Sequence, residues 1–233
     1  SQNFTMFTMD NEIYLGLIMQ YYTNKTLADF LELRRKGLLP SDVQSNTSVI
    51  YQIIIGIAEG MNYLISEKSI IHRNLTTSNI LIDESLYPKI TDFGLSIHTE
   101  VNYSNEVYLY DPKEYVDPVY VAPEIWTKNR CSPASDVYSY GMILYEILTG
   151  IKPFDGLTKY QIIQKVADEE ERPEIPEKVP DSFRTIIQKC WSQNPEDRPT
   201  FREISSLINS SASDILDKSV SFLQLQLQTM SSG

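Results

Sequence analysis

The chain has 233 residues, of which 42% are hydrophobic, so it can bury a core and form one or two domains. Its formal net charge of -11, with no basic cluster larger than Arg34 to Lys36, argues against a nucleic-acid backbone as partner. Apolar runs fall short of a membrane span, and Cys131 and Cys190 lack disulfide or metal-ligand spacing, which predicts a cytoplasmic protein.

In chain order, the pattern predicts two strands, then helices interrupted by a second pair of strands, then helices alone. Period-two alternation and turn residues place the strands at residues 4–8, 13–19, 80–83 and 89–91. Apolar residues at helical spacing place the helices at residues 27–33, 48–65, 135–149, 159–168, 181–190 and 200–209. The predicted fold class is therefore α+β, a helical domain with a few strands at one edge.

The C-terminal tail carries a separate signal. Its apolar residues repeat at four-three-four-three spacing, in the order Leu216, Val220, Leu223, Leu227 and Met230. This spacing would put one apolar stripe along a short helix, while the alternation over residues 223–228 fits a strand equally well. We expect the tail to pack back on the domain rather than to form an oligomer.

A motif between the long helix and the second pair of strands carries the chemistry. Residues 71–75 read Ile-His-Arg-Asn-Leu, Asn79 follows, and an Asp-Phe-Gly triplet begins at Asp92. The motif resembles the protein-kinase catalytic loop His-Arg-Asp-Leu-x-x-x-x-Asn and its Asp-Phe-Gly partner. In that family the loop Asp accepts the substrate hydroxyl proton, while the Asn and the second Asp hold Mg²⁺. The resemblance implies Asn79 and Asp92 as metal ligands and puts Asn74 at the catalytic base.

Asn74 departs from the family pattern at the proton acceptor. An amide can orient a hydroxyl, but it has no anionic form at physiological pH and cannot take the proton. Loss of a general base removes about two to four orders of magnitude in rate, although phosphoryl transfer relies mostly on positioning and electrostatics. Thr76 and Asp117 replace a Lys and a Thr of serine/threonine kinases, and Ser78 replaces an Arg of tyrosine kinases. These departures predict a pseudokinase.

Further residues extend the resemblance over about residues 13–210, nearest to the tyrosine-kinase-like branch. An Ala-Pro-Glu triplet ends at Glu124, and Arg198 resembles the family's partner for that carboxylate. We expect a buried structural pair, because a buried charge without a partner is costly. Asp136 resembles the residue that accepts backbone hydrogen bonds from the His-Arg segment.

The resemblance also assigns roles to residues beside the motif. It implies that His72 packs under Phe93 as a structural residue and that Arg73 pairs with a phosphate on the activation segment. Tyrosines crowd that segment at positions 103, 108, 110 and 115. They are candidate phosphorylation sites, although exposed loop tyrosines are common.

The nucleotide side of the site is only partly present in the sequence. The resemblance makes residues 1–22 the last N-lobe strands and hinge, residues 23–210 the C-lobe and residues 211–233 the tail. ATP with Mg²⁺ is the implied cofactor, and its adenine would meet Met19, Gln20, Tyr21, Tyr22 and Leu81. The 233 residues contain no Gly-x-Gly-x-x-Gly loop and no Val-Ala-x-Lys strand, so we expect a truncated N-lobe and weak nucleotide binding.

Three functions follow from these observations. The first is a pseudokinase that acts in signalling by binding a protein partner or by allostery. The second is an active serine/threonine kinase, present here as a fragment, that transfers the ATP γ-phosphate to a protein substrate despite Asn74. The third is a structural scaffold that binds no nucleotide. An upstream Gly-rich loop and strand lysine in the full-length protein would favour the first two.

Overall fold

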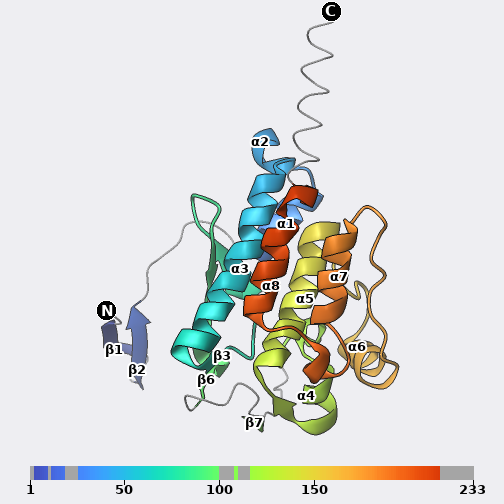
Figure 1. Ribbon diagram of the computed structural model, residues 1–233. Coiled ribbons are helices and arrows are strands. Elements are labelled where there is room, and N and C mark those ends of the chain that lie inside the picture. Colours follow the sequence, from blue (N-terminus) through green and yellow to red (C-terminus); the bar gives the residue numbers. More distant parts are fainter. Residues whose placement is uncertain (1–2, 10–11, 19–25, 100–107, 110–115, 216–233) are drawn as a thin grey trace, which may run out of the picture.

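A computed structural model gives the structure of the chain (Figure 1). It describes residues 3–9, 12–18, 26–99, 108–109 and 116–215. Within these residues, helices form the body of the molecule and the strands pair into short antiparallel two-stranded sheets. The predicted α+β class, mainly helical with few strands, is confirmed.

The first two strands form an antiparallel hairpin. β1 (Asn3–Met9) pairs with β2 (Glu12–Ile18), so that Asn3 lies opposite Ile18 and Met9 lies opposite Glu12. Both strands were expected from the alternation of apolar residues. The expected last residue of the second strand, Met19, lies outside the described residues.

The body consists of helices that surround one central helix. They are α1 (Leu27–Arg35), α2 (Ser41–Gln44), α3 (Thr47–Lys68), α4 (Pro123–Lys128), α5 (Pro133–Thr149), α6 (Lys159–Ile163), α7 (Asp181–Cys190) and α8 (Phe201–Ser210). In Figure 1, α5 stands beside α3, α8 and α7, and it contacts α3 and α7 directly. α5 is buried at every residue from Ser135 to Ile147, as expected of a helix enclosed on all sides.

The structure confirms the predicted helices with small changes at their ends, and it corrects one of them. The helix expected at 48–65 runs over Thr47–Lys68, because Asn46 caps its start through Oδ1 and the N–H of Ser48, 2.9 Å apart. The helix expected at 159–168 is divided: α6 ends at Ile163, and a π-helical turn covers Gln164–Asp168. The π turn adds a residue to the hydrogen-bonded ring, which a 3.6-residue pattern cannot predict. α2 and α4 were not predicted because such short helices carry little periodicity.

The second pair of predicted strands forms a hairpin that lies directly on α3. β4 (Ile80–Ile82) pairs with β5 (Pro88–Ile90). A Cβ atom on Gly56 would lie 2.7 Å from Pro88 Cγ, and one on Gly60 would lie 2.9 Å from Ile90 Cδ1. The two glycines therefore let the hairpin approach the helix backbone. The other short pairs are β3 (Ile70–Ile71) with β6 (Ile97–His98), and β7 (Tyr108–Leu109) with β8 (Arg130–Cys131).

α3 and the two cysteines belong to the core of the described residues. Among the described residues, α3 alone has the length and mean hydropathy of a membrane span, but its apolar face packs against α8 and α5 as a core helix. Cys131 and Cys190 are both buried and free. Burial raises the pKa of the Cys131 thiol to about 11. Both side chains therefore act as small core residues rather than as reactive thiols.

Glu124 and Arg198 form the expected buried ion pair. The guanidinium donates from Nη1 to Oε1 at 2.9 Å and from Nη2 to Oε2 at 2.8 Å, a bidentate arrangement. Arg198 also donates to three backbone carbonyls, and Glu124 accepts a further bond from Ser135 Oγ at 2.8 Å. The guanidinium carbon lies 5.2 Å from the ring centre of Tyr138. The pair therefore joins the start of α4 to the loop before α8.

Replacing Arg198 by Ala should lower the free energy of unfolding by roughly 3 to 5 kcal/mol, because Glu124 would remain buried without its cation. Urea unfolding followed by circular dichroism measures the change. Arg202→Ala is the matched control, since Arg202 is exposed on α8 and should change stability by less than about 0.5 kcal/mol. An unchanged midpoint for Arg198→Ala would remove the pair from the account of stability.

Candidate functional site

A carboxylate on the central helix holds the loop that follows β3. Asp136 is 1% exposed and accepts the N–H groups of His72 at 2.7 Å and Arg73 at 2.9 Å. Burial raises the pKa of Asp136, and the His72 and Arg73 donors oppose that rise. Arg73 has a φ of +64°, a left-handed conformation that non-glycine residues rarely adopt. The two hydrogen bonds hold this strained turn in place, and the contact predicted for Asp136 is confirmed.

His72 lies inside the loop and contacts the segment that begins at Asp92. Its Nε2 lies 2.9 Å from the carbonyl oxygen of Thr91, and its Nδ1 accepts the N–H of Asn74 at 3.3 Å. These partners assign the ring proton to Nε2. The imidazole also packs edge-on against Phe93, with ring centres 5.1 Å apart. The expected structural role of His72 is therefore confirmed.

The β4–β5 hairpin brings the two expected metal ligands side by side. The N–H and the hydroxyl of Thr91 both donate to the carbonyl oxygen of Asn79, at 2.9 and 3.1 Å. Asp92 follows Thr91 directly, with φ +60° and ψ +70°. Aspartate tolerates this left-handed conformation better than most residues, but the position remains strained.

Asn74 contacts both of those residues. Its side-chain Nδ2 donates to Asp92 Oδ2 at 3.0 Å, and its backbone carbonyl oxygen accepts a hydrogen bond from Asn79 Nδ2 at 2.8 Å. Asp92 Oδ1 also accepts the N–H of Gly94 at 3.4 Å. Asn74, Asn79 and Asp92 therefore form one hydrogen-bonded cluster at the end of the hairpin.

The substitutions at Thr76 and Asp117 have local structural roles. Thr76 is buried, and its hydroxyl accepts the N–H of Asn79 at 3.2 Å to cap a 3₁₀ turn over Thr77–Asn79. Asp117 Oδ1 accepts the N–H of Val119 at 3.1 Å and caps a similar turn. Neither side chain presents a cation.

The structure reaches only part of the predicted nucleotide and phosphate sites. Met19, Gln20, Tyr21 and Tyr22 lie outside the described residues. Leu81 lies in β4, and its backbone bridges to Thr26 at the start of α1. Its predicted place beneath adenine stays a prediction. Arg73 Nε donates to the carbonyl oxygen of Leu95, which ties it to the segment after Asp92. Its pairing with a phosphate also stays a prediction, and tyrosines 103, 110 and 115 lie outside the described residues.

Comparison with known proteins decides the family. Residues 3–208 match the family described as "Protein tyrosine and serine/threonine kinase". This chain belongs to the protein kinase family. It is 33% identical over 201 residues to dual specificity protein kinase shkD of Dictyostelium discoideum, covering 84% of this chain and 26% of that kinase. It is 32% identical to serine/threonine-protein kinase STY17 of Arabidopsis thaliana, covering 87% and 33%, and 36% identical to human tyrosine-protein kinase FRK, covering 80% and 39%. The chain thus spans about a quarter to two-fifths of these relatives.

The residues of this kinase-family chain fit a Mg²⁺ ion as a partial set of ligands, which water and substrate phosphates would complete. The described residues contain no group of three or more His, Cys, Asp or Glu side chains that could enclose a metal. Mg²⁺ is usually held by one or two protein oxygens together with water and substrate phosphates. Asp92 offers its carboxylate, and Asn79 uses its Nδ2 on Asn74, which leaves its Oδ1 as the ligating end.

A buried polar network beneath the kinase loop was not predicted. Glu146 on α5 is 2% exposed; its Oε1 accepts Arg35 Nη1 at 3.1 Å and its Oε2 accepts the Tyr120 hydroxyl at 2.8 Å. The Tyr120 hydroxyl also lies 2.9 Å from Thr77 Oγ1. Burial and the neighbouring Glu146 raise the pKa of Tyr120, so it stays a donor. The sequence signal was a carboxylate within the apolar stretch of this helix, which requires a partner.

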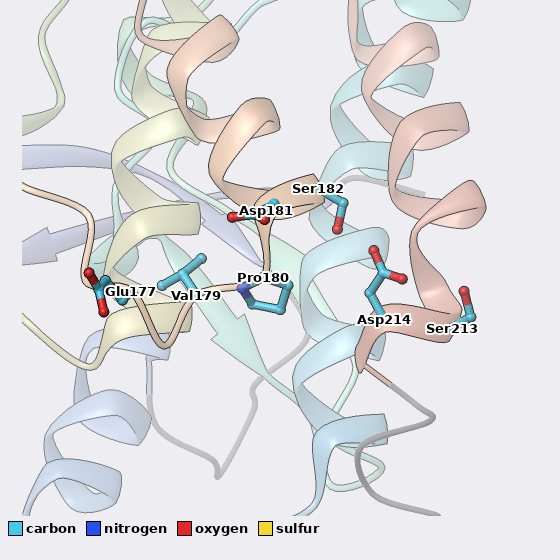
Figure 2. A pocket seen from close by; sticks show the side chains of 7 residues that line it. All are labelled: Glu177, Val179, Pro180, Asp181, Ser182, Ser213 and Asp214. Atoms are coloured by element: carbon cyan, nitrogen blue, oxygen red, sulfur yellow. The ribbon is translucent and has the colours of Figure 1, made fainter.

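A separate surface depression of about 450 Å³ lies between the start of α7 and the residues after α8 (Figure 2). Its lining residues are Glu177, Val179, Pro180, Asp181, Ser182, Ser213 and Asp214. The carboxylates give it an acidic character. It shares no residue with the cluster of Asn74, Asn79 and Asp92, so it lies outside the candidate site.

Tyr120→Phe should lower the free energy of unfolding by roughly 1 to 3 kcal/mol, because the buried Glu146 carboxylate would lose one of its two donors, the buried one. Urea unfolding measures the loss. Tyr160→Phe removes the same hydroxyl from a side chain that is 83% exposed and should leave the midpoint unchanged. Equal stability of the two variants would contradict the assigned role of Tyr120.

Proposed function

We propose that this kinase-family chain is a pseudokinase that acts in cytoplasmic signalling by binding a protein partner or by allostery. The observation that carries the proposal is Asn74 at the position of the general base. Its side chain donates a hydrogen bond to Asp92 and has no group that takes a proton near neutral pH. A general base contributes about 10² to 10⁴ in rate, so its replacement removes most of the proton-transfer catalysis.

Two further positions support the proposal. Thr76 and Asp117 stand where serine/threonine kinases use a lysine and a threonine around the substrate phosphate. Here the Thr76 hydroxyl and the Asp117 carboxylate each cap a local turn. The Asp117 carboxylate would repel an incoming phosphate, and Thr76 lacks the positive charge with which a lysine would attract it. The three departures together favour a binding function over transfer.

An active kinase is the second candidate, and the loop geometry favours it. Asp136 holds the His72–Arg73 turn, and Asn79 and Asp92 lie together as a metal site requires. The relatives reported above all carry the name of a kinase. ATP with Mg²⁺, when bound, supplies the phosphoryl group and neutralises its charge. Asn79 and Asp92 would hold the metal, and Asn74 could still orient a substrate hydroxyl.

Phosphotransfer by the 233-residue chain should be indistinguishable from that of its Asp92→Ala variant. A radiolabel assay with a generic protein substrate measures the transfer. Asn74→Asp alone should not restore it, because Thr76 and Asp117 would remain and the sequence has no strand lysine for the phosphates. Turnover that disappears in Asp92→Ala would assign the active-kinase function instead.

Nucleotide should stabilise the chain only slightly. With ATP and Mg²⁺ near their dissociation constants, the gain follows RT ln(1 + [L]/Kd), or about 0.4 kcal/mol. A thermal-shift assay at millimolar ATP and MgCl₂ measures it, with Asp92→Asn as the variant that weakens the metal ligand. A large shift that disappears in Asp92→Asn would mean that the chain builds a complete nucleotide pocket.

A further inference from the structure

The contact between Asn74 and Asp92 assigns a specific role to the residue that replaces the base. Asn74 Nδ2 lies 3.0 Å from Asp92 Oδ2. Only the NH₂ end of the amide can face an ionised carboxylate at this distance, because its oxygen would be repelled. The contact is therefore an attraction between a neutral donor and an anion. An aspartate at position 74 would face Asp92 with a second negative charge.

The backbone of Asn74 is held by two hydrogen bonds, one at its N–H and one at its C=O, while its side chain donates to Asp92. Its backbone N–H donates to His72 Nδ1 at 3.3 Å, and its backbone carbonyl oxygen accepts a hydrogen bond from Asn79 Nδ2 at 2.8 Å. His72 is completely buried and the loop is tied to Asp136. The amide therefore belongs to the rigid part of the loop. A rigid donor loses little freedom when it makes its bond.

Asp92 requires such a partner. Its φ of +60° places the backbone in the left-handed region, and a strained residue persists only when its surroundings hold it. Within the described residues, its carboxylate accepts from Gly94 N at 3.4 Å and from Asn74 Nδ2 at 3.0 Å. The Gly94 bond is long, so Asn74 is the stronger of the two contacts.

We propose that the Asn74 amide occupies Asp92 in place of a divalent cation. The site then keeps the backbone arrangement of a metal site without metal, and a metal ion must displace or share the Asn74 bond. This inference rests on the proposed function, because it explains how a pseudokinase keeps an ordered loop without Mg²⁺. It also predicts that metal affinity is lowered by the same residue that replaces the base.

Three variants of the full chain test the proposal. Asn74→Ala removes the donor without adding charge, and Asn74→Asp replaces the donor by a carboxylate. Asn62→Asp is the control: it adds the same charge on α3, where Asn62 Oδ1 accepts Ser66 Oγ, a bond that a carboxylate keeps. Two quantities are measured: the melting temperature in EDTA, and the affinity for Mn²⁺ alone from the electron paramagnetic resonance signal of the free ion.

In EDTA, wild type and Asn62→Asp should have the same melting temperature. Asn74→Ala should melt at a lower temperature, and Asn74→Asp at the lowest. Asn74→Ala should bind Mn²⁺ about fivefold more tightly than wild type, because metal no longer competes with a hydrogen bond of about 1 kcal/mol. Asn74→Asp should gain more in melting temperature on Mn²⁺ addition than wild type does. Unchanged or weaker Mn²⁺ binding by Asn74→Ala would overturn the proposal, as would equal melting of all variants in EDTA.

These outcomes are independent of the test of the proposed function. Phosphotransfer by the chain would refute the pseudokinase assignment whatever the Mn²⁺ affinities are. An unchanged Mn²⁺ affinity in Asn74→Ala would refute the role given to the amide, and the absence of transfer would still stand.

Discussion

The candidate site depends on the two hydrogen bonds that Asp136 accepts from the backbone of His72 and Arg73. They fix a left-handed turn, and the positions of Asn74 and Asn79 follow from that turn along the chain. The anchor is rigid because α5, which carries Asp136, is enclosed by the other helices. The same helix carries Glu146, whose carboxylate holds Arg35 and Tyr120. One buried helix therefore positions the loop before β4 and the segment before α4 through two carboxylates.

Much of the fold could be predicted because its long helices bury one face or all faces. The apolar spacing of Ile50 to Leu64 is dictated by burial against neighbouring helices, so α3 was recognisable from the sequence alone. α4, with six residues, and the strand pairs of two residues are too short to show a period, since they form in response to tertiary contacts. The π turn after α6 was missed for a related reason, since one extra residue in a turn leaves the apolar pattern nearly unchanged.

The site was predictable where a motif fixes it, and unpredictable where contacts between distant residues do. Sequence order placed Asn74, Asn79 and Asp92 in one motif, but not the direction of the Asn74 amide, which depends on the β4–β5 hairpin folding back beside the loop. The Glu146 network joins residues more than 100 positions apart, from Arg35 to Glu146. A carboxylate in an apolar stretch of helix indicates that a partner exists, but it does not name Tyr120 or Arg35.

The glycines at positions 56 and 60 have a mechanical consequence. They lie one helical turn apart on α3 and leave no side chain between the helix backbone and the β4–β5 hairpin. Side chains normally absorb small displacements between packed elements by changing rotamer. Here no side chain intervenes, so the α3 backbone directly sets the position of Pro88 and Ile90, and Asp92 follows Ile90 by two residues.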